Sequence, residues 1–325
     1  MAKEIKTIGV LTSGGDAPGM NAAVRAVVRT ALSKGIKVKG IERGYNGLLH
    51  NEMRDMDLRS VSEIIHRGGT VLYTARCLEF LTKEGQEQGA QCCRDNGIDA
   101  LVVIGGDGSF KGARALANLG IPCIGIPGTI DNDIACSEYT IGYDTAMNTA
   151  VEMVDKLRDT TQSHDRCSVV EVMGRHAGYI ALNVGIATGA IATLIPERPY
   201  DLERDILDRM SFTQKTGKKH FIIVKAEGVP GTAQDLANEI QAHTGIDSRA
   251  TVLGHVQRGG APTLRDRVTA SQMGYQAVYL LERGIFNRVV AVSADQIVDY
   301  DINVALAMHK TIDTKMIDVA NTISI

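Results

Sequence analysis

Runs of apolar residues alternate along the chain with segments in which apolar and polar residues recur at helical spacing. Strand-like runs span Thr7–Leu11, Ala100–Gly106 and Ile121–Ile126, and a helix-like stretch follows each of the first two. The alternation continues with strand candidates at Cys167–Met173, His220–Ala226, Thr251–Val256 and Arg288–Ser293, and a helix candidate at Leu264–Gly284. Uninterrupted apolar strands separated by amphipathic helices predict parallel sheets with crossover helices, which is an α/β fold.

The first predicted helix has recognisable ends. Asn21 suits the N-cap position, and Gly35 can end the helix. An apolar stripe lies between them, while Arg25 and Arg29, four residues apart, fall together on a face that we expect to be exposed.

The length of the chain bounds its organisation. With 325 residues it exceeds the usual size of one domain, so we expect two domains or one large α/β domain with an excursion. Hydrophobic residues make up 44%, charged residues 22%, and the net charge is −3, which is ordinary for a chain that folds throughout. Because the basic residues are scattered, neither a nucleic-acid partner nor a membrane surface is indicated.

The termini and the cysteines bear on the compartment. The apolar run near the N-terminus is too short for a signal peptide, and no run of about 18 apolar residues occurs. The six cysteines lack CxxC spacing, which favours free thiols over disulfides or a metal site. We therefore expect a cytoplasmic protein.

Three glycine-rich turns follow predicted strands, at Ser13–Asn21 (SGGDAPGMN), Gly105–Ser109 (GGDGS) and Pro127–Ile134 (PGTIDNDI). Because the carboxyl ends of parallel strands meet at one edge of a sheet, we expect the turns to converge there. Glycines let a phosphate approach the backbone, whose N–H groups then point at it. One such loop alone is better explained by turn chemistry, but three converging loops predict a phosphate site.

The nucleotide-binding fingerprints of dehydrogenases and P-loop proteins are both absent, because neither GxGxxG nor GxxxxGK[ST] occurs where it is required. In GGDGS, the carboxylate of Asp107 instead stands among backbone donors. A carboxylate that faces polyphosphate is repelled unless a cation lies between them, so Asp107 is a candidate Mg²⁺ ligand, directly or through water. Capping of the following helix is the competing explanation.

The turn PGTIDNDI carries two carboxylates, Asp131 and Asp133, one residue apart. Such a pair can form an Asx turn, bind a metal or accept a proton from a substrate. The residues by themselves leave all three roles open.

Seven segments taken together and in order resemble the bacterial ATP-dependent 6-phosphofructokinases: LTSGGDAPGMNAA, IIHRGGTVLYTARC, VVIGGDGS, PGTIDNDI, EVMGRHAG, AEGV and LGHVQRGG. The resemblance extends from Ile8 to the end of the chain. The GGDG turn alone would not carry it, because NAD kinases and diacylglycerol-type lipid kinases also have one. The resemblance implies transfer of phosphate from Mg-ATP to the 1-hydroxyl of fructose 6-phosphate, with Mg²⁺ as cofactor.

The same resemblance implies roles at the reacting centre. Asp131 would accept the hydroxyl proton, while Thr129 and Asp133 hold the sugar near the metal. A neighbouring carboxylate raises the pKa of an acid and a cation lowers it, so Asp133 and Mg²⁺ would shift the pKa of Asp131 in opposite directions. Gly15, through its N–H, and Arg175 would stabilise the transferring phosphoryl group. Without the family, Arg175 is explained as a surface arginine.

The resemblance further assigns residues to each ligand. Those implied for ATP are Gly15, Tyr45, Arg76, Cys77, Gly106, Asp107, Gly108 and Ser109. Those implied for the sugar phosphate are Thr129, Asp131, Asp133, Arg166, Met173, Gly174, Arg175, Glu227, Arg249, His255 and Arg258. A sugar phosphate carries about two negative charges, which the forked donors of arginine suit. Arg166 and Arg249 would reach a neighbouring subunit's site, so the resemblance implies a homotetramer with shared active sites. Read alone, His255 is equally a core histidine and Glu227 a turn residue.

An effector site for ADP as activator or phosphoenolpyruvate as inhibitor is also implied. Its residues would be Arg25, Arg29, Glu63, Arg158, Gly189, Lys218, Lys219 and His220. Two positions depart from the pattern, because Ile191 stands in place of a glutamate that helps to hold the effector's Mg²⁺, and Thr216 in place of an arginine that meets its phosphate. An isoleucine cannot bind a cation, and one lost charge-assisted contact costs about 1.5–3 kcal/mol.

Two glycines bear on the phosphoryl donor. Pyrophosphate-dependent relatives carry aspartate where Gly108 stands and lysine where Gly128 stands, and both side chains would fill the space of the α-phosphate of ATP. Glycine at both positions favours ATP. A pyrophosphate-dependent phosphofructokinase and a non-catalytic nucleotide-sensing module on the same fold are the alternatives.

The resemblance implies two stacked Rossmann-like α/β domains with mainly parallel sheets. A larger, ATP-binding domain would comprise residues 1–142 and 257–308. A smaller, fructose 6-phosphate-binding domain would comprise residues 143–256 and 309–325.

We predict that activation by ADP is weak or altered while catalysis is intact, because Ile191 and Thr216 remove a metal ligand and a phosphate contact from the effector site. The measurement is a steady-state assay at sub-saturating fructose 6-phosphate with and without ADP. Strong, Mg²⁺-dependent stimulation by ADP would contradict the prediction.

Overall fold

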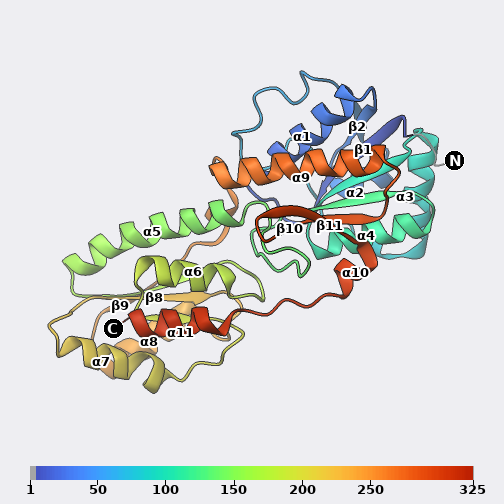
Figure 1. The fold of residues 1–325 in the computed structure, drawn as a ribbon. Coiled ribbons are helices and arrows are strands. Elements are labelled where there is room, and N and C mark those ends of the chain that lie inside the picture. The colour runs from blue at the N-terminus through green and yellow to red at the C-terminus, as the bar shows by residue number, and fades with distance from the viewer. Residues whose placement is uncertain (1–4, 325) are drawn as a thin grey trace. The chain divides into compact units, whose positions relative to one another are not determined.

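A computed structural model describes residues 5–324 of the chain. They form two compact units, which are coloured along the chain in Figure 1. Unit 1 comprises Met1–Thr145 and Arg258–Lys310, and unit 2 comprises Ala146–Gln257 and Thr311–Ile325. The chain therefore passes between the units after Thr145, after Gln257 and after Lys310, where the sequence predicted crossings after residues 142, 256 and 308.

Unit 1 is built on a seven-stranded sheet in the order β11-β10-β5-β4-β1-β2-β3. Its strands are β1 Thr7–Ser13, β2 Lys37–Ile41, β3 Met53–Met56, β4 Ala100–Gly105, β5 Cys123–Pro127, β10 Arg288–Ser293 and β11 Gln296–Asp301. The five central strands are parallel, and only the edge strands β3 and β11 pair antiparallel with their neighbours. The predicted parallel α/β arrangement is confirmed, including the bounds of β10.

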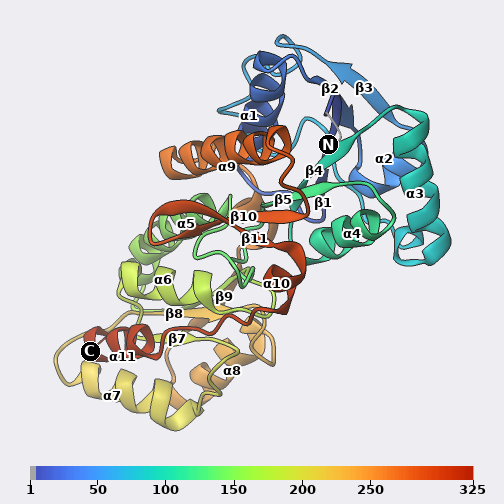
Figure 2. The same cartoon turned by 45° about the vertical axis from the view of Figure 1, so that its right-hand side comes forward.

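Helices cover both faces of this sheet (Figure 2). They are α1 Met20–Ser33, α2 Gly44–Leu49, α3 Lys83–Asp95, α4 Asp107–Asn118, α9 Leu264–Glu282 and α10 Ile302–Ala307, with a 3-10 turn η1 at Glu79–Leu81. Helices α1 and α9 pack against each other on one face, and α2, α3 and α4 lie on the other. Every residue of β4 is buried, because a central parallel strand is covered on both sides and must be apolar throughout.

Two expectations for α1 are wrong. Gly19, in the left-handed region at φ 108°, precedes the helix as its N-cap, so Asn21 lies within the first turn. The Asn21 amide instead holds a distant loop, donating to the carbonyls of Arg67 and Gly68 at 3.1 Å each and accepting the N–H of Val71 at 2.7 Å. Arg25 and Arg29 are half-buried rather than exposed.

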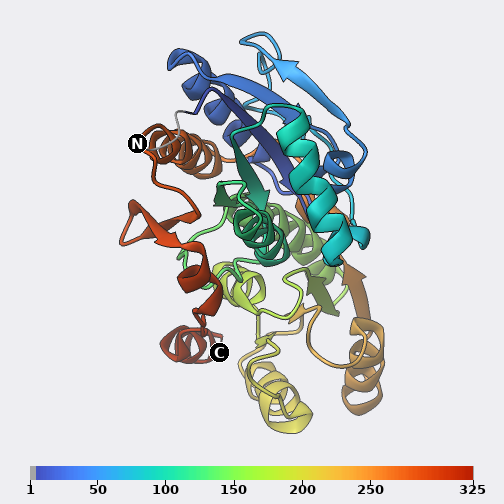
Figure 3. The same cartoon turned by 90° about the vertical axis from the view of Figure 1, so that its right-hand side faces the viewer.

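Unit 2 contains a four-stranded parallel sheet in the order β7-β8-β6-β9. Its strands are β6 Cys167–Val172, β7 Ala192–Leu194, β8 Phe221–Ala226 and β9 Ser248–Val252. Its helical elements are α6 Tyr179–Thr188, a π-helical turn η2 Glu203–Leu207, α7 Asp208–Gln214, α8 Ala233–Thr244 and α11 Thr314–Ile323. The crossover helices α6 and α8 lie on opposite faces of this sheet (Figure 1), and Figure 3 gives the view turned by 90°. The long helix α5, Tyr143–Ser163, contains the first crossing between the units.

The predicted strand Thr251–Val256 is wrong at both ends. Strand β9 begins earlier, at Ser248, and ends at Val252. Gly254 adopts a left-handed conformation at φ 54°, which an extended strand cannot accommodate. The chain therefore turns into a 3-10 helix, η3 Gly254–Arg258.

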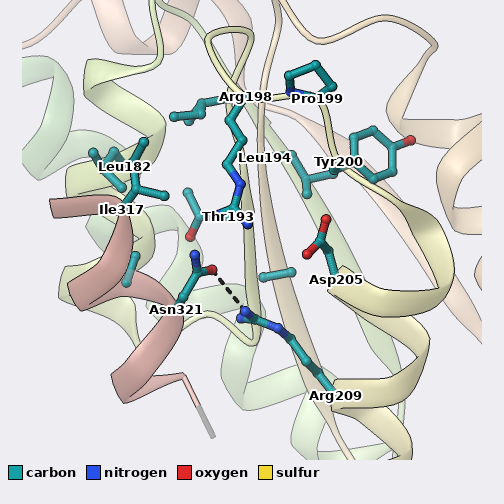
Figure 4. Close-up of a pocket in the computed structure, with 13 residues that line it drawn as sticks. Leu182, Thr193, Leu194, Arg198, Pro199, Tyr200, Asp205, Arg209, Ile317 and Asn321 are labelled. Carbon is teal, nitrogen blue, oxygen red and sulfur yellow. Dashed lines mark hydrogen bonds between the residues drawn. The ribbon is translucent and has the colours of Figure 1, made fainter. Parts of the chain in front are cut away.

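Arg209 anchors the C-terminal helix α11 to unit 2. Figure 4 shows its guanidinium pointing at Asn321, whose Oδ1 accepts a hydrogen bond of 3.0 Å. The same guanidinium donates to Ser324 Oγ at 3.0 Å and to the carbonyl of Ile191 at 3.3 Å. Between α11 and these residues lies a cavity of about 20 Å³, which is room for about one water molecule. None of the predicted catalytic or ligand-binding residues lines it.

All six cysteines are free thiols, as the sequence predicted. None of the helices within residues 5–324 combines the length and the apolar character that a membrane crossing requires.

A buried carboxylate, Asp266, links two segments of unit 1. One segment ends where the chain leaves the unit after Thr145, and the other follows its return after Gln257. Asp266 is fully inaccessible to solvent and accepts hydrogen bonds from the Tyr139 hydroxyl, the Gly142 N–H at 2.7 Å and the Thr145 N–H at 2.9 Å. The Thr145 hydroxyl also donates to Asp266, at 2.5 Å, and accepts the Thr263 N–H at 3.0 Å. Burial raises the pKa of Asp266, and the four hydrogen bonds oppose that rise.

We predict that Asp266→Ala lowers the thermal unfolding midpoint by about 6 to 12 °C. The substitution leaves buried N–H and O–H donors without an acceptor, which costs about 3 kcal/mol for a network of this kind, and each kcal/mol lowers the midpoint of a unit of this size by about 2–4 °C. Calorimetry measures the shift. The control is Asp318→Ala on the exposed face of α11, which we expect to stay within about 2 °C of the unsubstituted protein. Equal melting of the two variants would contradict the prediction.

Candidate phosphoryl-transfer site

The three glycine-rich turns of unit 1 begin side by side. Ser13 of β1 is paired in register with Gly105 of β4, which is paired in turn with Pro127 of β5. Hydrogen bonds join the turns beyond the strands, from Ser109 Oγ to the Ser13 carbonyl at 3.1 Å and from the Gly128 N–H to the Gly105 carbonyl at 3.0 Å. The predicted convergence at the carboxyl edge is confirmed.

The first turn brings Gly15 against Arg258. The Arg258 Nη1 donates to the Asp16 carbonyl at 3.0 Å, and a Cβ on Gly15 would overlap the guanidinium. Gly14 lies in the left-handed region at φ 89°, and its carbonyl accepts the Thr74 hydroxyl at 2.7 Å. Two residues that the resemblance assigned to different ligands, Gly15 and Arg258, therefore touch within unit 1. A side chain at position 15 would displace the arginine.

The second turn leads into helix α4, and no side chain caps the start of that helix. Gly106 is the N-cap and provides no side chain, so the first N–H groups of the helix are left for a ligand. A Cβ added at Gly106 or Gly108 would meet no atom of the described chain within 4 Å. The space above this turn is therefore open, as an anion at the N-terminus of a 12-residue helix requires.

Asp107, the first residue of α4, is the candidate metal ligand of this turn. Its carboxylate is half-exposed and forms an ion pair of 3.2 Å with Lys111 one turn later. Among residues 5–324 no group of three or more His, Cys, Asp or Glu side chains is arranged to hold a metal. Mg²⁺ is usually held by one or two carboxylates together with substrate phosphates and water, and a single exposed carboxylate beside free N–H donors fits that mode.

The side chain of Tyr45 packs against the second turn and bonds its backbone. Its hydroxyl donates to the Ser109 carbonyl at 2.6 Å, and its ring stacks on Phe80 with the centroids 4.1 Å apart. The side chain is only 5% exposed, and burial raises the pKa of its hydroxyl well above the ordinary value. Gly112 is required beside it, because a Cβ there would lie 2.7 Å from the ring. The sequence assigned Tyr45 to the nucleotide but did not indicate this supporting contact. Arg76 is exposed and Cys77 half-buried in the loop that precedes η1.

The third turn distinguishes its two carboxylates. Asp131 is 6% exposed, whereas Asp133 is exposed. Between them Asn132 adopts a left-handed conformation at φ 52°, which breaks the alternation of an extended chain. Thr129 closes the turn by accepting the Asp131 N–H on its hydroxyl at 3.2 Å, and its carbonyl accepts the Thr140 hydroxyl at 2.6 Å.

In unit 2, Arg166 and Arg249 share one carboxylate. Asp247 accepts Arg166 Nε at 2.6 Å on one oxygen and Arg249 Nε at 2.9 Å on the other. Desolvation works to raise the pKa of Asp247, but the hydrogen bond from Arg166 and the charge of Arg249 outweigh it and lower that pKa. The structure thus brings the two predicted phosphate-binding arginines together. Sequence reasoning missed Asp247, although an acid next to the start of a strand and two residues before Arg249 was a usable signal.

The turn after β6 presents Arg175 to solvent. Gly174 and Arg175 both have positive φ, at 142° and 57°. The carboxylate of Glu227 accepts their N–H groups at 3.2 and 2.6 Å, and Gln257 Oε1 accepts the Met173 N–H at 2.8 Å. Glu227 is therefore more than a turn residue, because it fixes the backbone that carries Arg175. The fully buried Gln257 was missed, since a polar residue inside GHVQRGG gives no sign of its burial.

His255 is exposed, on the 3-10 helix η3. The alternative of a core histidine is therefore excluded.

The predicted effector residues fall into one group in each unit. In unit 1, burial and the charge of Arg29 lower the pKa of Arg25, and the charge of Glu63 opposes this, so the three lie close enough to interact. In unit 2, burial and the charge of Arg158 lower the pKa of Lys218, and burial and the charges of Lys218 and Arg158 lower that of His220.

The surroundings of the unit 2 group are also defined. Arg158 donates to the Thr188 carbonyl at the end of α6, where Gly189 is the left-handed C-cap at φ 59°. Lys219 and Thr216 are exposed, whereas Ile191 is fully buried and part of the core. The Ile191 side chain therefore packs inside unit 2 and offers nothing to a ligand.

Comparison with known proteins identifies the family. Residues 7–281 match the family described as Phosphofructokinase, so the chain belongs to that family. It is 54% identical over 320 residues to an ATP-dependent 6-phosphofructokinase of Clostridium botulinum (strain Loch Maree), a match that covers 98% of this chain and all of that protein. It is also 54% identical over 321 residues to an ATP-dependent 6-phosphofructokinase of Clostridioides difficile (strain 630), covering 99% of this chain and all of that protein.

Solved structures support the same fold. A phosphofructokinase from Saccharomyces cerevisiae aligns with a TM-score of 0.89 at 36% identity and covers 98% of this chain. The chain spans about half the length of that yeast chain, 48%. A pyrophosphate-dependent phosphofructokinase from Marinobacter aquaeolei aligns with a TM-score of 0.86 at 25% identity, covering 96% of this chain and 86% of that one. The predicted phosphofructokinase-type α/β fold is confirmed.

Proposed function

We infer that the protein transfers a phosphoryl group from ATP to the 1-hydroxyl of fructose 6-phosphate, forming fructose 1,6-bisphosphate in glycolysis. The curated relatives that match over their whole length are ATP-dependent 6-phosphofructokinases. The observation that carries the inference is the register of β1, β4 and β5, because it sets two phosphate-binding turns beside the turn that holds Asp131.

ATP is favoured over pyrophosphate as the donor. A Cβ built on Gly108 would meet no atom of the described chain within 4 Å. The space there therefore accommodates a donor larger than pyrophosphate. Gly128 is packed instead, because a Cβ on it would lie 3.1 Å from Ile104 and 3.2 Å from Met20. A lysine at that position, as in the pyrophosphate-dependent pattern, would have to displace both side chains.

We assign the proton transfer to Asp131. Its burial beneath the turn keeps bulk water from the carboxylate, and Thr129 and Thr140 hold the turn in place. As general base, the carboxylate takes the proton of the 1-hydroxyl while the oxygen attacks the terminal phosphorus of ATP. Asp133 is exposed at the same turn and is assigned to the sugar.

The phosphoryl group is stabilised by donors rather than by covalent chemistry. The N–H of Gly15, the N–H groups at the start of α4 and the guanidinium of Arg175 are the donors assigned to it. Asp107 would hold Mg²⁺, which when bound neutralises charge on the phosphates of ATP. Arg76 is assigned to the same phosphates. ATP binding thus falls to unit 1, with Tyr45 supporting Ser109 from below.

Fructose 6-phosphate binding is assigned mainly to unit 2. Met173, Gly174 and Glu227 contribute the turn that carries Arg175, and His255 is exposed on η3. Arg166 and Arg249 are supported by Asp247 as a pair of forked donors for the 6-phosphate. Arg258, in unit 1, is the remaining phosphate ligand. A homotetramer in which Arg166 and Arg249 serve a neighbouring subunit's site belongs to this proposal.

Regulation and compartment complete the proposal. The cations Arg158 and Lys218, with His220 beside them, suit an anionic effector such as ADP or phosphoenolpyruvate, whereas the buried Ile191 cannot help to hold its metal. Free thiols throughout are typical of a reducing compartment, which supports the cytoplasm.

We predict that the purified protein turns over fructose 6-phosphate faster with Mg-ATP than with pyrophosphate, because the open space at Gly108 admits the α-phosphate. A coupled assay that detects fructose 1,6-bisphosphate measures both rates at equal donor concentration. Faster turnover with pyrophosphate would overturn the choice of donor. No turnover with either donor would overturn the activity and leave the nucleotide-sensing alternative.

We predict that Asp131→Ala lowers kcat by about two or more decades while the KM values for ATP and fructose 6-phosphate change little, since a general base acts on the transition state. The exposed substitution Asp318→Ala is the matched control and should retain full turnover. Thermal melting of both variants checks that each is folded. Unchanged turnover in Asp131→Ala would leave Asp131 as a structural turn residue.

A further inference from the structure

A lysine far along the chain is bonded to the backbone of the turn that carries Asp131. Lys310 Nζ donates to the carbonyl of Asn132 at 2.8 Å and to the carbonyl of Ser137 at 2.7 Å. The lysine stands 178 residues after Asn132, beyond the end of α10, and is the last residue of unit 1. Neither the motifs of the sequence nor the assigned roles in catalysis include it.

The segment between Gly128 and Ile141 is a closed loop on which these two bonds act. Its ends meet in a bridge between Gly128 and Ile141, next to strand β5. Inside the loop, the Thr140 hydroxyl bonds the Thr129 carbonyl at 2.6 Å, and the Asn132 amide donates to the Glu138 carbonyl at 3.2 Å. Lys310 joins the two halves of the loop from outside, because one of its acceptors lies in each half.

The Asn132 carbonyl is the point at which support is most needed. Asn132 lies in the left-handed region at φ 52°, which asparagine adopts more readily than most residues but which contacts from the surroundings still help to hold. The peptide that follows this residue separates the buried Asp131 from the exposed Asp133. A donor on that carbonyl fixes the orientation of the peptide, and with it the direction in which the Asp131 side chain leaves the backbone.

Lys310 is half-buried but still carries a positive charge near pH 7. Burial lowers its pKa to about 8, although the charges of Asp133 and Glu138 around it act in the opposite direction. Burial also raises the pKa of Cys136 to about 11, so that group is a neutral thiol near pH 7. Lys310 is therefore an ammonium below pH 8, and its bonds to the two carbonyls are charge-assisted.

We propose that Lys310 is a positioning residue for the reaction, which holds the left-handed turn at Asn132 and thereby aims the carboxylate of Asp131. The proposal rests on the proposed function, because the loss of this support is measured as a lower kcat, which depends on Asp131 acting as the general base. Lys310 touches backbone carbonyls and acts through Asp131. A displacement of a catalytic group by about 1 Å can cost up to about 100-fold in rate, which sets the size of the expected effect.

The test compares Lys310→Met, which keeps the length of the side chain but has no donor, with Lys310→Arg, which keeps donors and charge. Lys315→Met is the matched control, since Lys315 is exposed and lies five residues further along the chain. For Lys310→Met we expect kcat to fall about 10- to 100-fold, with the KM for ATP within about threefold of the unsubstituted protein. Lys310→Arg should recover most of the loss, and Lys315→Met should match the unsubstituted protein.

A second measurement does not depend on activity. Amide hydrogen exchange of the peptides within residues 128–141 should be at least about tenfold faster in Lys310→Met than in Lys315→Met. Exchange in β6 and β8 of unit 2 should be the same in both variants. If Lys310→Met does not fold, Lys310→Leu, which also lacks a donor, replaces it under the same criteria.

The outcomes separate this proposal from the proposed function. Unchanged kcat in Lys310→Met, or a loss of kcat without faster exchange in residues 128–141, overturns the positioning role. If the unsubstituted protein shows no turnover with ATP and fructose 6-phosphate, the proposed function fails, and the role of Lys310 in catalysis fails with it. Faster exchange in residues 128–141 together with a selective loss of kcat supports both.

Discussion

The constraint on which the rest of the molecule depends is the parallel register of β1, β4 and β5. These strands are apolar and buried, so they can lie only in the middle of a covered sheet, and parallel pairing brings their carboxyl ends to the same edge. Ser13, Gly105 and Pro127 then start three turns at neighbouring positions. A slip of one strand would separate those turns and turn its buried side chains to the other face of the sheet.

The polar groups at the turns that follow the strands serve in two distinct ways. Some face open space, such as the N–H groups above Gly106 and the guanidinium of Arg175. Others are bonded to the backbone of a turn, among them Glu227, which is exposed, and Asp266, which is buried. Glu227 fixes the turn of Arg175, and Asp266 fixes the segment between Tyr139 and Thr145. Because buried groups of this kind must be satisfied, removal of one loosens the turn that it holds.

Much of the candidate site was accessible from the sequence, because its parts are local. Glycine next to a strand end, an aspartate within GGDG and the pair in IDND carry their chemistry in a few adjacent residues. The long-range contacts that support these parts were not accessible in this way. Asp247 and Gln257 lie far in the chain from the arginine and the methionine that they hold, at separations of 81 and 84 residues. The assignment of Asn21 to the N-cap failed for the same reason, since its amide bonds a loop 46 to 50 residues away.

The sequence by itself determined the alternation of strands and helices, the three glycine-rich turns and the family resemblance, because apolar periodicity and glycine placement are properties of neighbouring residues. Only the tertiary structure decided that Asp131 is buried and Asp133 exposed. Two carboxylates one residue apart look equivalent in a sequence, and in an extended strand they would share a face. The left-handed conformation of Asn132 separates them, and that conformation is held by contacts from Thr140 and Lys310, which reach the turn only once the chain has folded.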